Sequence, residues 1–191
     1  MKELTIGPND AGQRLDRFLL KAVPLLPSSL CQKYLRLKRV RLNGRPATKG
    51  DTRLTAGDVL SLYLSDEFFE KPSDDNAYRK VATPRLSIVY EDENILLADK
   101  APGMLCHHAE GEPPERTLLA NIQAHLLLTG AWRPKEENAF TPALCNRIDR
   151  NTGGIVIAAK NAEALRILNE KIRDRELDKR YLCAVLGVPR P

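Results

Sequence analysis

The chain has 191 residues, 42% of them hydrophobic and 29% charged, which suits one medium domain or two small ones in a soluble globular protein. The sequence excludes a membrane-spanning helix, because no apolar run approaches the roughly 20 residues that such a helix needs. The first ten residues lack the apolar stretch of a signal peptide, so a cytoplasmic protein is expected.

The net charge of +5 is concentrated at the N-terminal end. Residues 1–64 contain 12 lysines and arginines and 5 acids, a net charge of +7, whereas residues 65–191 contain 18 and 20, a net charge of −2. Nine basic residues and no acid lie between Asp16 and Asp51. This separation favours a basic module that binds a polyanion. The alternative is an ordinary solvated basic face.

Two helices are predicted near the N-terminus. Apolar residues at helical spacing predict a helix over residues 14–23, which ends at the first of two prolines. A second helix is expected to begin at Ser28 or Ser29, since serine is a favoured N-cap residue. The apolar stripe that this second helix is expected to bury consists of Leu30, Tyr34 and Leu37.

Strand and turn signals follow the helices. Residues 40–42 predict a strand, Asn43-Gly44 predicts a tight turn, and residues 59–64 predict a strand with three leucines on one face. This order of two helices and a small sheet resembles the S4 domain, an RNA-binding domain first named from a ribosomal small-subunit protein. The stretches that carry the resemblance are GQRLDRF (12–18), VRLNG (40–44), KGD (49–51) and AGDV (56–59).

The S4 resemblance implies that the second helix and the turn after it bind RNA phosphates. Clustered lysines and arginines neutralise phosphates and release counterions, which gives a salt-dependent affinity with little sequence readout. The residues expected to contact RNA are Arg14, Lys33, Arg36, Lys38, Arg39, Arg41, Asn43 and Lys49.

The chain is expected to divide into an S4-type domain (1–64), a linker (65–84) and a second domain (85–191). The linker is polar and acidic, and Phe68 and Phe69 could dock it on a neighbour. From residue 86 strands and helices mix without a regular βαβ repeat, so the fold class is expected to be α+β. The expected strands cover 86–90, 95–99, 155–159 and 180–186, and the expected helices cover 117–128 and 162–174.

The stretch CNRIDRNTGG places Asp149 between Arg147 and Arg150, shortly before two glycines. Nearby guanidinium groups lower the pKa of a carboxyl group and keep it ionised, as a nucleophile or a base requires. The glycines would let another backbone or a substrate come close. From these residues alone, a structural ion pair and a reactive carboxylate both remain open.

Four stretches of the chain, one of them around Asp149, resemble the motifs of one protein family and occur in the same order. Residues 147–155 (RIDRNTGGI) resemble H-R-L-D-x-x-T-S-G-L, the catalytic motif of RNA pseudouridine synthases of the RluA/RluC/RluD type. Residues 90–105 resemble the first motif of this family, which contains K-P-x-G. Residues 155–160 resemble its apolar strand ending in A-K, and residues 179–187 resemble K-x-Y-x-A-x-V-x-G. With the S4-type domain in front, the resemblance covers nearly the whole chain.

The family resemblance implies an enzyme that converts uridine to pseudouridine in RNA without a metal or another cofactor. It implies that Asp149 is the catalytic aspartate, that Tyr181 stacks on the uracil, and that Arg147 fills the stack left by the flipped nucleotide. Large-subunit ribosomal RNA is the expected substrate and transfer RNA is the alternative. An RNA-binding protein in which Asp149 only forms an ion pair is a further alternative.

The sequence departs from the family pattern in two ways. Asn146 stands where the family usually has histidine, Asn151 and Gly154 replace a common aspartate and serine, and Ala101 replaces a proline. In addition, a later motif, L-x-T-G-R-x-H-Q-I-R, is absent. The chain is therefore expected to be a fragment of a longer enzyme, or else a short protein whose catalytic half cannot close. In either case we expect no activity from this chain alone, and association through an open sheet edge.

Weaker signals predict no further chemistry. Cys106, His107, His108 and His125 do not have the spacing of a zinc site, so no metal is expected. Trp132 lies alone in a polar loop, where it could pack on the linker or touch RNA. The four cysteines form no C-x-x-C pair and are expected to be free, mostly buried thiols: Cys31, Cys106, Cys145 and Cys183.

Overall fold

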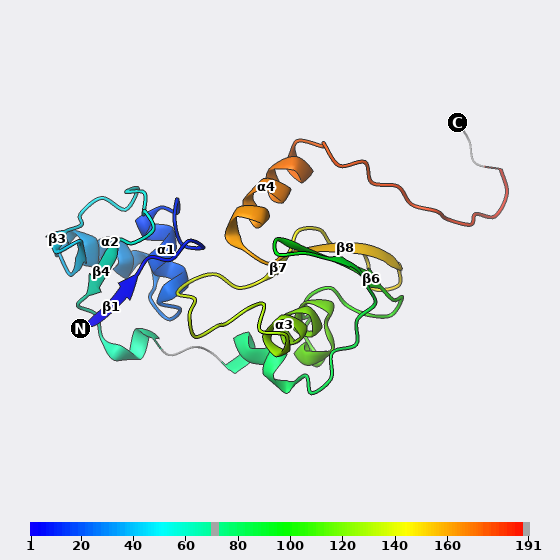
Figure 1. Ribbon diagram of the computed structural model, residues 1–191, viewed down its shortest axis with the longest axis horizontal. Helices are drawn as coiled ribbons and strands as arrows, with labels where there is room; N and C mark the ends of the chain where they lie inside the picture. Colours follow the sequence, from blue (N-terminus) through cyan, green and yellow to red (C-terminus); the bar gives the residue numbers. More distant parts are fainter. Residues whose placement is uncertain (70–72, 189–191) are drawn as a thin grey trace.

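The computed structural model of the chain describes residues 1–69 and 73–188. Each half of the chain contains a four-stranded antiparallel sheet with helices packed beside it (Figure 1). This arrangement confirms the expected α+β class. Among the described helices, none combines the length and the apolar character needed to cross a bilayer.

The N-terminal half contains the two predicted helices and a sheet with the strand order β1-β4-β2-β3. Asn43 and Gly44 have φ angles of 51° and 77°, which confirms the tight turn, and Leu60, Leu62 and Leu64 are all buried, as predicted. The elements are β1 (Lys2–Thr5), α1 (Leu15–Ala22), α2 (Ser28–Arg36), β2 (Val40–Leu42), β3 (Arg45–Pro46) and β4 (Val59–Leu62).

The buried stripe of α2 differs from the prediction. Cys31 and Leu35 are buried, whereas Leu30 and Tyr34 pack only partly against the core. Leu37 is 54% exposed, because α2 ends at Arg36 and Leu37 no longer follows the helical periodicity that the prediction assumed.

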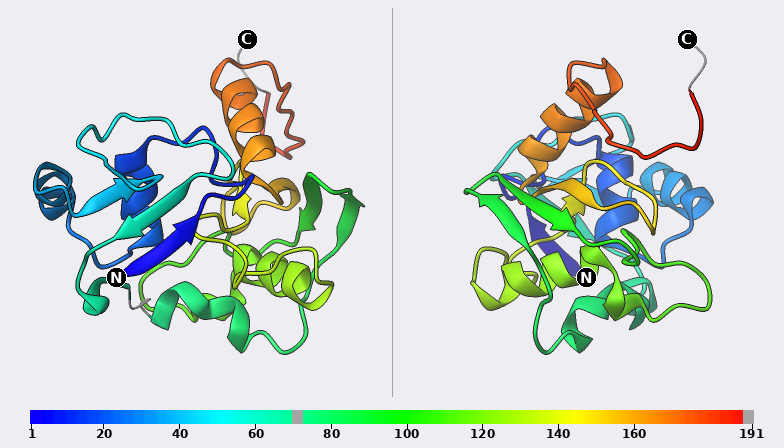
Figure 2. Two further views of the ribbon diagram at one scale, coloured as in Figure 1. Left: turned by 60° about the vertical axis from the view of Figure 1, so that its left-hand side comes forward. Right: turned by 90° about the vertical axis from the view of Figure 1, so that its right-hand side faces the viewer.

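The C-terminal half contains a sheet with the order β5-β6-β8-β7, with α3 and α4 on opposite sides of it (Figure 2). Leu118, Ile122 and Leu126 of α3 belong to one core with the buried residues of β6 and β8. Leu165, Leu168 and Ile172 of α4, expected to face inward, are only half-buried. The elements are β5 (Ile88–Glu91), β6 (Ile95–Lys100), η3 (Pro114–Arg116), α3 (Leu118–Leu128), β7 (Ala143–Leu144), β8 (Gly154–Ala159) and α4 (Ala162–Arg173).

The predicted strand over residues 180–186 does not form. The described chain continues beyond α4 to residue 188 without joining either sheet (Figure 1). The alternating apolar residues of this segment suit a strand, but a strand also needs a neighbouring edge to pair with. No edge in the described part of the chain pairs with it, so the prediction was wrong for this chain.

The segment predicted as a linker packs closely on both halves. It contains two short 3-10 helices, η1 (Asp66–Phe69) and η2 (Ser73–Lys80). Phe68 and Phe69 pack against the N-terminal core, as predicted. Tyr78 is buried with its ring 5.0 Å from that of Trp132, which is itself buried. Trp132 therefore packs on the linker, and its burial excludes contact with RNA.

The two halves are joined by amide side chains. Asn138 donates through Nδ2 to the carbonyl of Thr5 at 2.7 Å and to Oδ2 of Asp10 at 2.8 Å. Asn9 donates to Oε1 of Glu137 at 2.7 Å and accepts from the first backbone N–H of α4, at Ala162, at 3.1 Å. The N-terminal half thus contacts the start of α4 directly.

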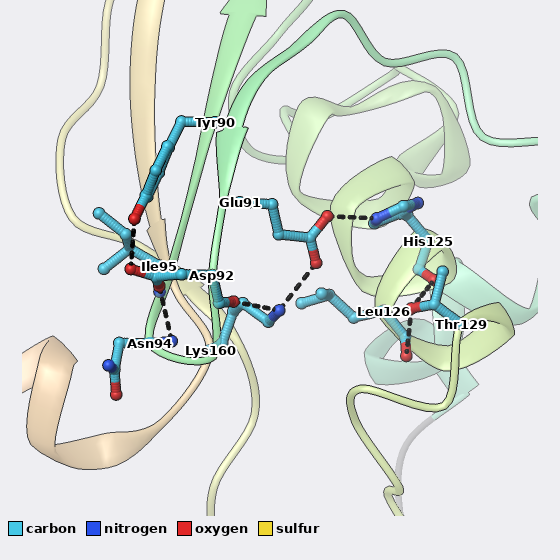
Figure 3. A network of polar contacts seen from close by, with 9 residues as sticks. All are labelled: Tyr90, Glu91, Asp92, Asn94, Ile95, His125, Leu126, Thr129 and Lys160. Atoms are coloured by element: carbon cyan, nitrogen blue, oxygen red, sulfur yellow. Dashed lines mark hydrogen bonds and ion pairs between the residues drawn. The ribbon is translucent and has the colours of Figure 1, made fainter.

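Glu91 ties three elements of the C-terminal half together (Figure 3). At the end of β5, its carboxylate accepts from Nζ of Lys160, just after β8, at 2.8 Å. Its other oxygen lies 2.8 Å from Nε2 of His125 on α3. Burial alone would raise the pKa of Glu91, but the hydrogen bonds from Lys160 and His125 outweigh burial and lower that pKa.

Candidate active site and nucleic-acid interface

The candidate catalytic aspartate lies on the loop that connects β7 to β8. The backbone N–H of Cys145 donates to the carbonyl of Ile157 at 2.7 Å and extends the pairing of the two strands. Asn146 then continues it with its side chain, which accepts from the N–H of Ile157 at 2.8 Å and donates to the carbonyl of Ile155 at 3.3 Å. Asn146, at the position where the family usually has histidine, therefore anchors the start of this loop.

Asp149 is exposed, and among the described residues it forms no ion pair with Arg147 or Arg150, the two arginines expected to flank its carboxylate. Arg150 pairs instead with Glu112, with Nη1 and Oε1 2.8 Å apart, and donates from Nε to the carbonyl of Gly103 at 3.2 Å. Within the described residues, Arg147 is exposed and makes no ion pair. The prediction that Arg150 lies against Asp149 rested on their adjacency in the sequence. In the fold, Arg150 forms its ion pair with Glu112, which lies on a distant loop.

A buried lysine holds the Asp149 loop in place. Lys100, at the end of β6, is only 1% exposed. Its ammonium group donates to the carbonyls of Ala101, Met104 and Arg150 at 3.1, 2.8 and 3.0 Å. A buried ammonium requires such acceptors, since an unpaired one would be costly. Lys100 therefore links the turn after β6 to the residue next to Asp149.

The two loops also touch through their backbones. The N–H of Gly103 donates to the carbonyl of Arg150 at 2.8 Å. A Cβ atom on Gly153 would lie 3.2 Å from the ring of Pro102, a tight contact. This confirms the expectation that a glycine after Asp149 permits the close approach of another segment.

Tyr181 lies beside the same loop but not against Asp149. It lines a cleft of about 730 Å³ together with Asn146, Ile148 and Gly154, and Asp149 is not among the lining residues. Tyr181 is 65% exposed. Tyr181 and the loop that carries Asp149 therefore line the same cleft, but Asp149 itself is not part of its lining.

His107 lies close enough to Arg147 to be affected by its charge. Its Nδ1 is buried without a hydrogen-bond partner in the described part of the chain. Burial, and then the charge of Arg147, lower the pKa of His107, which favours the neutral imidazole at neutral pH. Among the described residues, no three histidine, cysteine or acidic side chains gather as metal ligands would.

The basic residues predicted to contact RNA are all exposed. Arg36 is the last residue of α2, and Lys38 adopts a left-handed backbone (φ 58°) immediately after that helix. Arg41 lies on β2, with its guanidinium 5.4 Å from the ring of Tyr63. Six of the predicted cations make no ion pair among the described residues: Lys33, Arg36, Lys38, Arg39, Arg41 and Lys49.

Arg14 and Asn43 are already engaged within the protein. Arg14 donates twice to the carboxylate of Asp16, at 3.1 and 2.7 Å, which raises the pKa of Arg14 and lowers that of Asp16. Asn43 donates to Asp58 at 2.8 Å and accepts from the N–H of Val59 at 2.8 Å. Both side chains thus stabilise turns of the N-terminal half.

No role for Lys100 was predicted from the sequence, although it lies in the stretch 90–105 that resembles the family's first motif. A lysine at the end of an apolar strand, directly before A-P-G, was the available signal. Lysines are rarely buried, and the link that Lys100 makes between two loops depends on tertiary contacts that the sequence does not show.

Two family models match the chain. The model described as RNA pseudouridylate synthase matches residues 94–190, and that described as S4 domain matches residues 13–60. Both matches fall on the parts of the chain in which the corresponding motifs were found.

Several proteins of bacteria are similar in sequence to this chain. An uncharacterized RNA pseudouridine synthase of Mycoplasma genitalium is 36% identical, over 92% of this chain and 53% of its own length. Ribosomal large subunit pseudouridine synthase C of Haemophilus ducreyi is 34% identical (96% and 53%), and that of Escherichia coli is 30% identical (98% and 55%). The chain spans about half the length of the curated relatives it matches.

Solved structures add little to this relationship. The chain named human RNA pseudouridylate synthase domain containing 1 aligns with a TM-score of 0.35 and 18% identity, over 56% of this chain and 31% of that one. The two family matches and the sequence relatives, in contrast, agree over nearly the whole chain. The chain belongs to the RNA pseudouridylate synthase family and carries an S4 domain in its N-terminal half.

Proposed function

We propose that the protein to which this chain belongs converts uridine to pseudouridine in RNA, in the cytoplasm, with Asp149 as the catalytic residue. Asp149 supports this proposal because it is exposed on a loop that the buried Lys100 fixes in place. An exposed acid on a rigid loop can meet a nucleotide that has been flipped out of its helix.

The reaction is an isomerisation. The C1′–N1 bond of uridine breaks, the uracil turns, and a C1′–C5 bond forms, after which C5 loses a proton and N1 gains one. The carboxylate of Asp149 would act at the ribose or the base. The reaction is balanced in atoms and electrons without an oxidant, a metal or an energy source.

Arg147 and Tyr181 would assist the extruded nucleotide. Removing a base from a helix costs a few kcal/mol, which an inserted guanidinium and an aromatic stacking surface can offset. Arg147 is exposed two residues before Asp149, and Tyr181 lines the cleft beside the same loop. The role of Tyr181 requires its ring to reach a nucleotide held at Asp149, which is not among the residues that line the cleft.

We propose large-subunit ribosomal RNA as the substrate, held by the exposed cations of the N-terminal half. Several relatives are named as ribosomal large subunit pseudouridine synthases, which supports this choice over transfer RNA. We further propose that the S4-type domain covers residues 1–64 and the catalytic domain begins at residue 85. The domain match over residues 13–60 lies within the first of these ranges.

The test is a complementation experiment. A strain of the source organism that lacks the gene receives this chain, the full-length reading frame, or either one with Asp149→Asn, and pseudouridine is mapped in its ribosomal and transfer RNA. Modification by the full-length protein but not by its Asp149→Asn variant is expected. If the full-length protein restores no pseudouridine, or its variant restores it fully, the proposal is wrong.

RNA affinity separates the enzyme from a purely RNA-binding protein. We expect Asp149→Asn to abolish isomerisation while leaving the dissociation constant for RNA nearly unchanged. A collapse of affinity in the variant would instead assign Asp149 a structural role.

A further inference from the structure

A second basic surface lies outside the S4 domain. It is a cleft of about 840 Å³, here called the linker cleft, between the end of the linker, the turn after β6 and the start of α3. Its charged lining residues are Lys80, Arg85, Arg116, Arg150, Glu112 and Glu115. The cleft is therefore net positive, although residues 65–191 as a whole carry a net charge of −2.

Three of these cations are free to bind an anion. Arg150 is paired with Glu112. Lys80, Arg85 and Arg116 are exposed and make no ion pair within the described residues. Unpaired cations that share a cleft raise the local potential and favour a ligand that carries several negative charges.

The backbone N–H groups at the start of α3 are not available to bind an anion in the cleft. The backbone N–H groups of Leu118 and Leu119 donate to the carbonyls of Leu105 and Cys106, and that of Ala120 donates to Oγ1 of Thr117. Because these donors are satisfied internally, an anion in the cleft would have to be bound by the side chains of Lys80, Arg85 and Arg116.

The linker cleft is coupled to the Asp149 loop. Its wall includes residues 101–105 and Arg150, and Lys100 binds the carbonyls of Ala101, Met104 and Arg150 together. The cleft with Tyr181 lies along the other residues of the same loop. Asp149 thus stands on a loop shared by two clefts, one with an aromatic ring and the other with unpaired cations.

We propose that the linker cleft binds backbone phosphates of the RNA strand on one side of the nucleotide presented to Asp149. The ligand class is single-stranded RNA, read by charge and not by base. This inference rests on the proposed function, since it assumes that RNA reaches Asp149. It assigns Lys80, Arg85 and Arg116 as binding residues, in addition to the cations of the S4 domain.

The test measures the salt dependence of RNA binding. A fluorescently labelled, unstructured RNA oligonucleotide is titrated with the chain, and with its Arg85→Gln/Arg116→Gln variant, over a range of NaCl concentrations. Each phosphate contact on a single strand contributes about 0.7 to the slope of log K against log salt, so the variant should lose about 1.4. We also expect at least a several-fold weaker affinity at low salt.

A matched control removes the same charge elsewhere. Lys135→Gln/Arg175→Gln changes two exposed cations of the same half that do not line the cleft, and should leave the slope unchanged. Glu115→Gln removes an acid from the cleft and should strengthen binding. Circular dichroism checks that each variant is folded, and the single variants Arg85→Gln and Arg116→Gln replace the double one if it is not.

The outcomes separate this inference from the proposed function. If the cleft variant binds as the control does, the inference is wrong. If Arg36→Ala/Lys38→Ala still weakens binding in that case, the RNA-binding part of the proposed function stands. If cleft variants weaken binding but the full-length protein makes no pseudouridine, the cleft is an RNA site and the proposed reaction is wrong.

Discussion

At the scale of single residues, Lys100 has the largest predicted effect on stability. Replacing it with methionine keeps much of the buried volume but removes the ammonium donor from three carbonyls. The carbonyls of Arg150 and Ala101 keep one backbone donor each, from Gly103 and Met104, whereas that of Met104 loses the Lys100 donor. Leaving buried acceptors unsatisfied costs about 1–3 kcal/mol, so we expect Lys100→Met to lower the free energy of unfolding by that order. Urea titration followed by circular dichroism measures it, with Lys135→Met as an exposed control. Equal transition midpoints for the two variants would contradict the assigned role.

Cysteine reactivity gives a second prediction at the same scale. Burial raises the pKa of the Cys145 thiol to about 11, whereas Cys183 is exposed. At pH 8 only about one Cys145 side chain in a thousand would be the reactive thiolate. We expect iodoacetamide to label Cys183 well before Cys145, as measured by peptide mass spectrometry. The difference should disappear in urea, and rapid labelling of Cys145 in the folded chain would show that the thiol is accessible.

At the scale of elements, Glu91 makes the joint between β5, α3 and the end of β8 dependent on pH. The pKa of Glu91 is lowered on folding, so its contribution to stability is present above the unfolded pKa and is lost as pH falls through the folded pKa. We expect Glu91→Gln to lower the free energy of unfolding at pH 7, and the difference to shrink between about pH 5 and about pH 3. Urea titrations at several pH values test this, with the exposed Glu93→Gln as control. A difference that does not change with pH would mean that the loss is one of packing.

At the scale of the whole molecule, the second sheet exposes an apolar edge. β5 ends the strand order, and its residue Val89 is 59% exposed. Unpaired edge strands associate, and a charge on the edge opposes this. We expect the sedimentation coefficient of the chain to rise with concentration and Val89→Lys to suppress the rise, while Ile167→Lys, on the exposed surface of α4, does not. A single monomeric species at all concentrations would contradict the prediction.

Features that depend on residues close together in the chain could be predicted from the amino-acid sequence alone. The turn at Asn43-Gly44 follows from two residues that tolerate positive φ, and β6 and α3 follow from apolar residues at periods of 2 and 3.6. The motifs around Asp149 and Lys100 also lie in continuous stretches, so family membership could be predicted without coordinates. These signals are local, and tertiary contacts did not override them.

Which distant segments come into contact depends on the three-dimensional fold and could not be predicted from the sequence. Arg150 was expected beside Asp149 but pairs with Glu112, 38 residues away. Trp132 packs on Tyr78, and the apolar segment 180–186 stays unpaired because no described edge accepts it. The linker cleft likewise brings together Lys80, Arg85, Arg116 and Arg150 from separate segments. Ion pairs, strand pairs and clefts depend on which surfaces the fold brings into contact, and residue spacing along the chain does not contain that information.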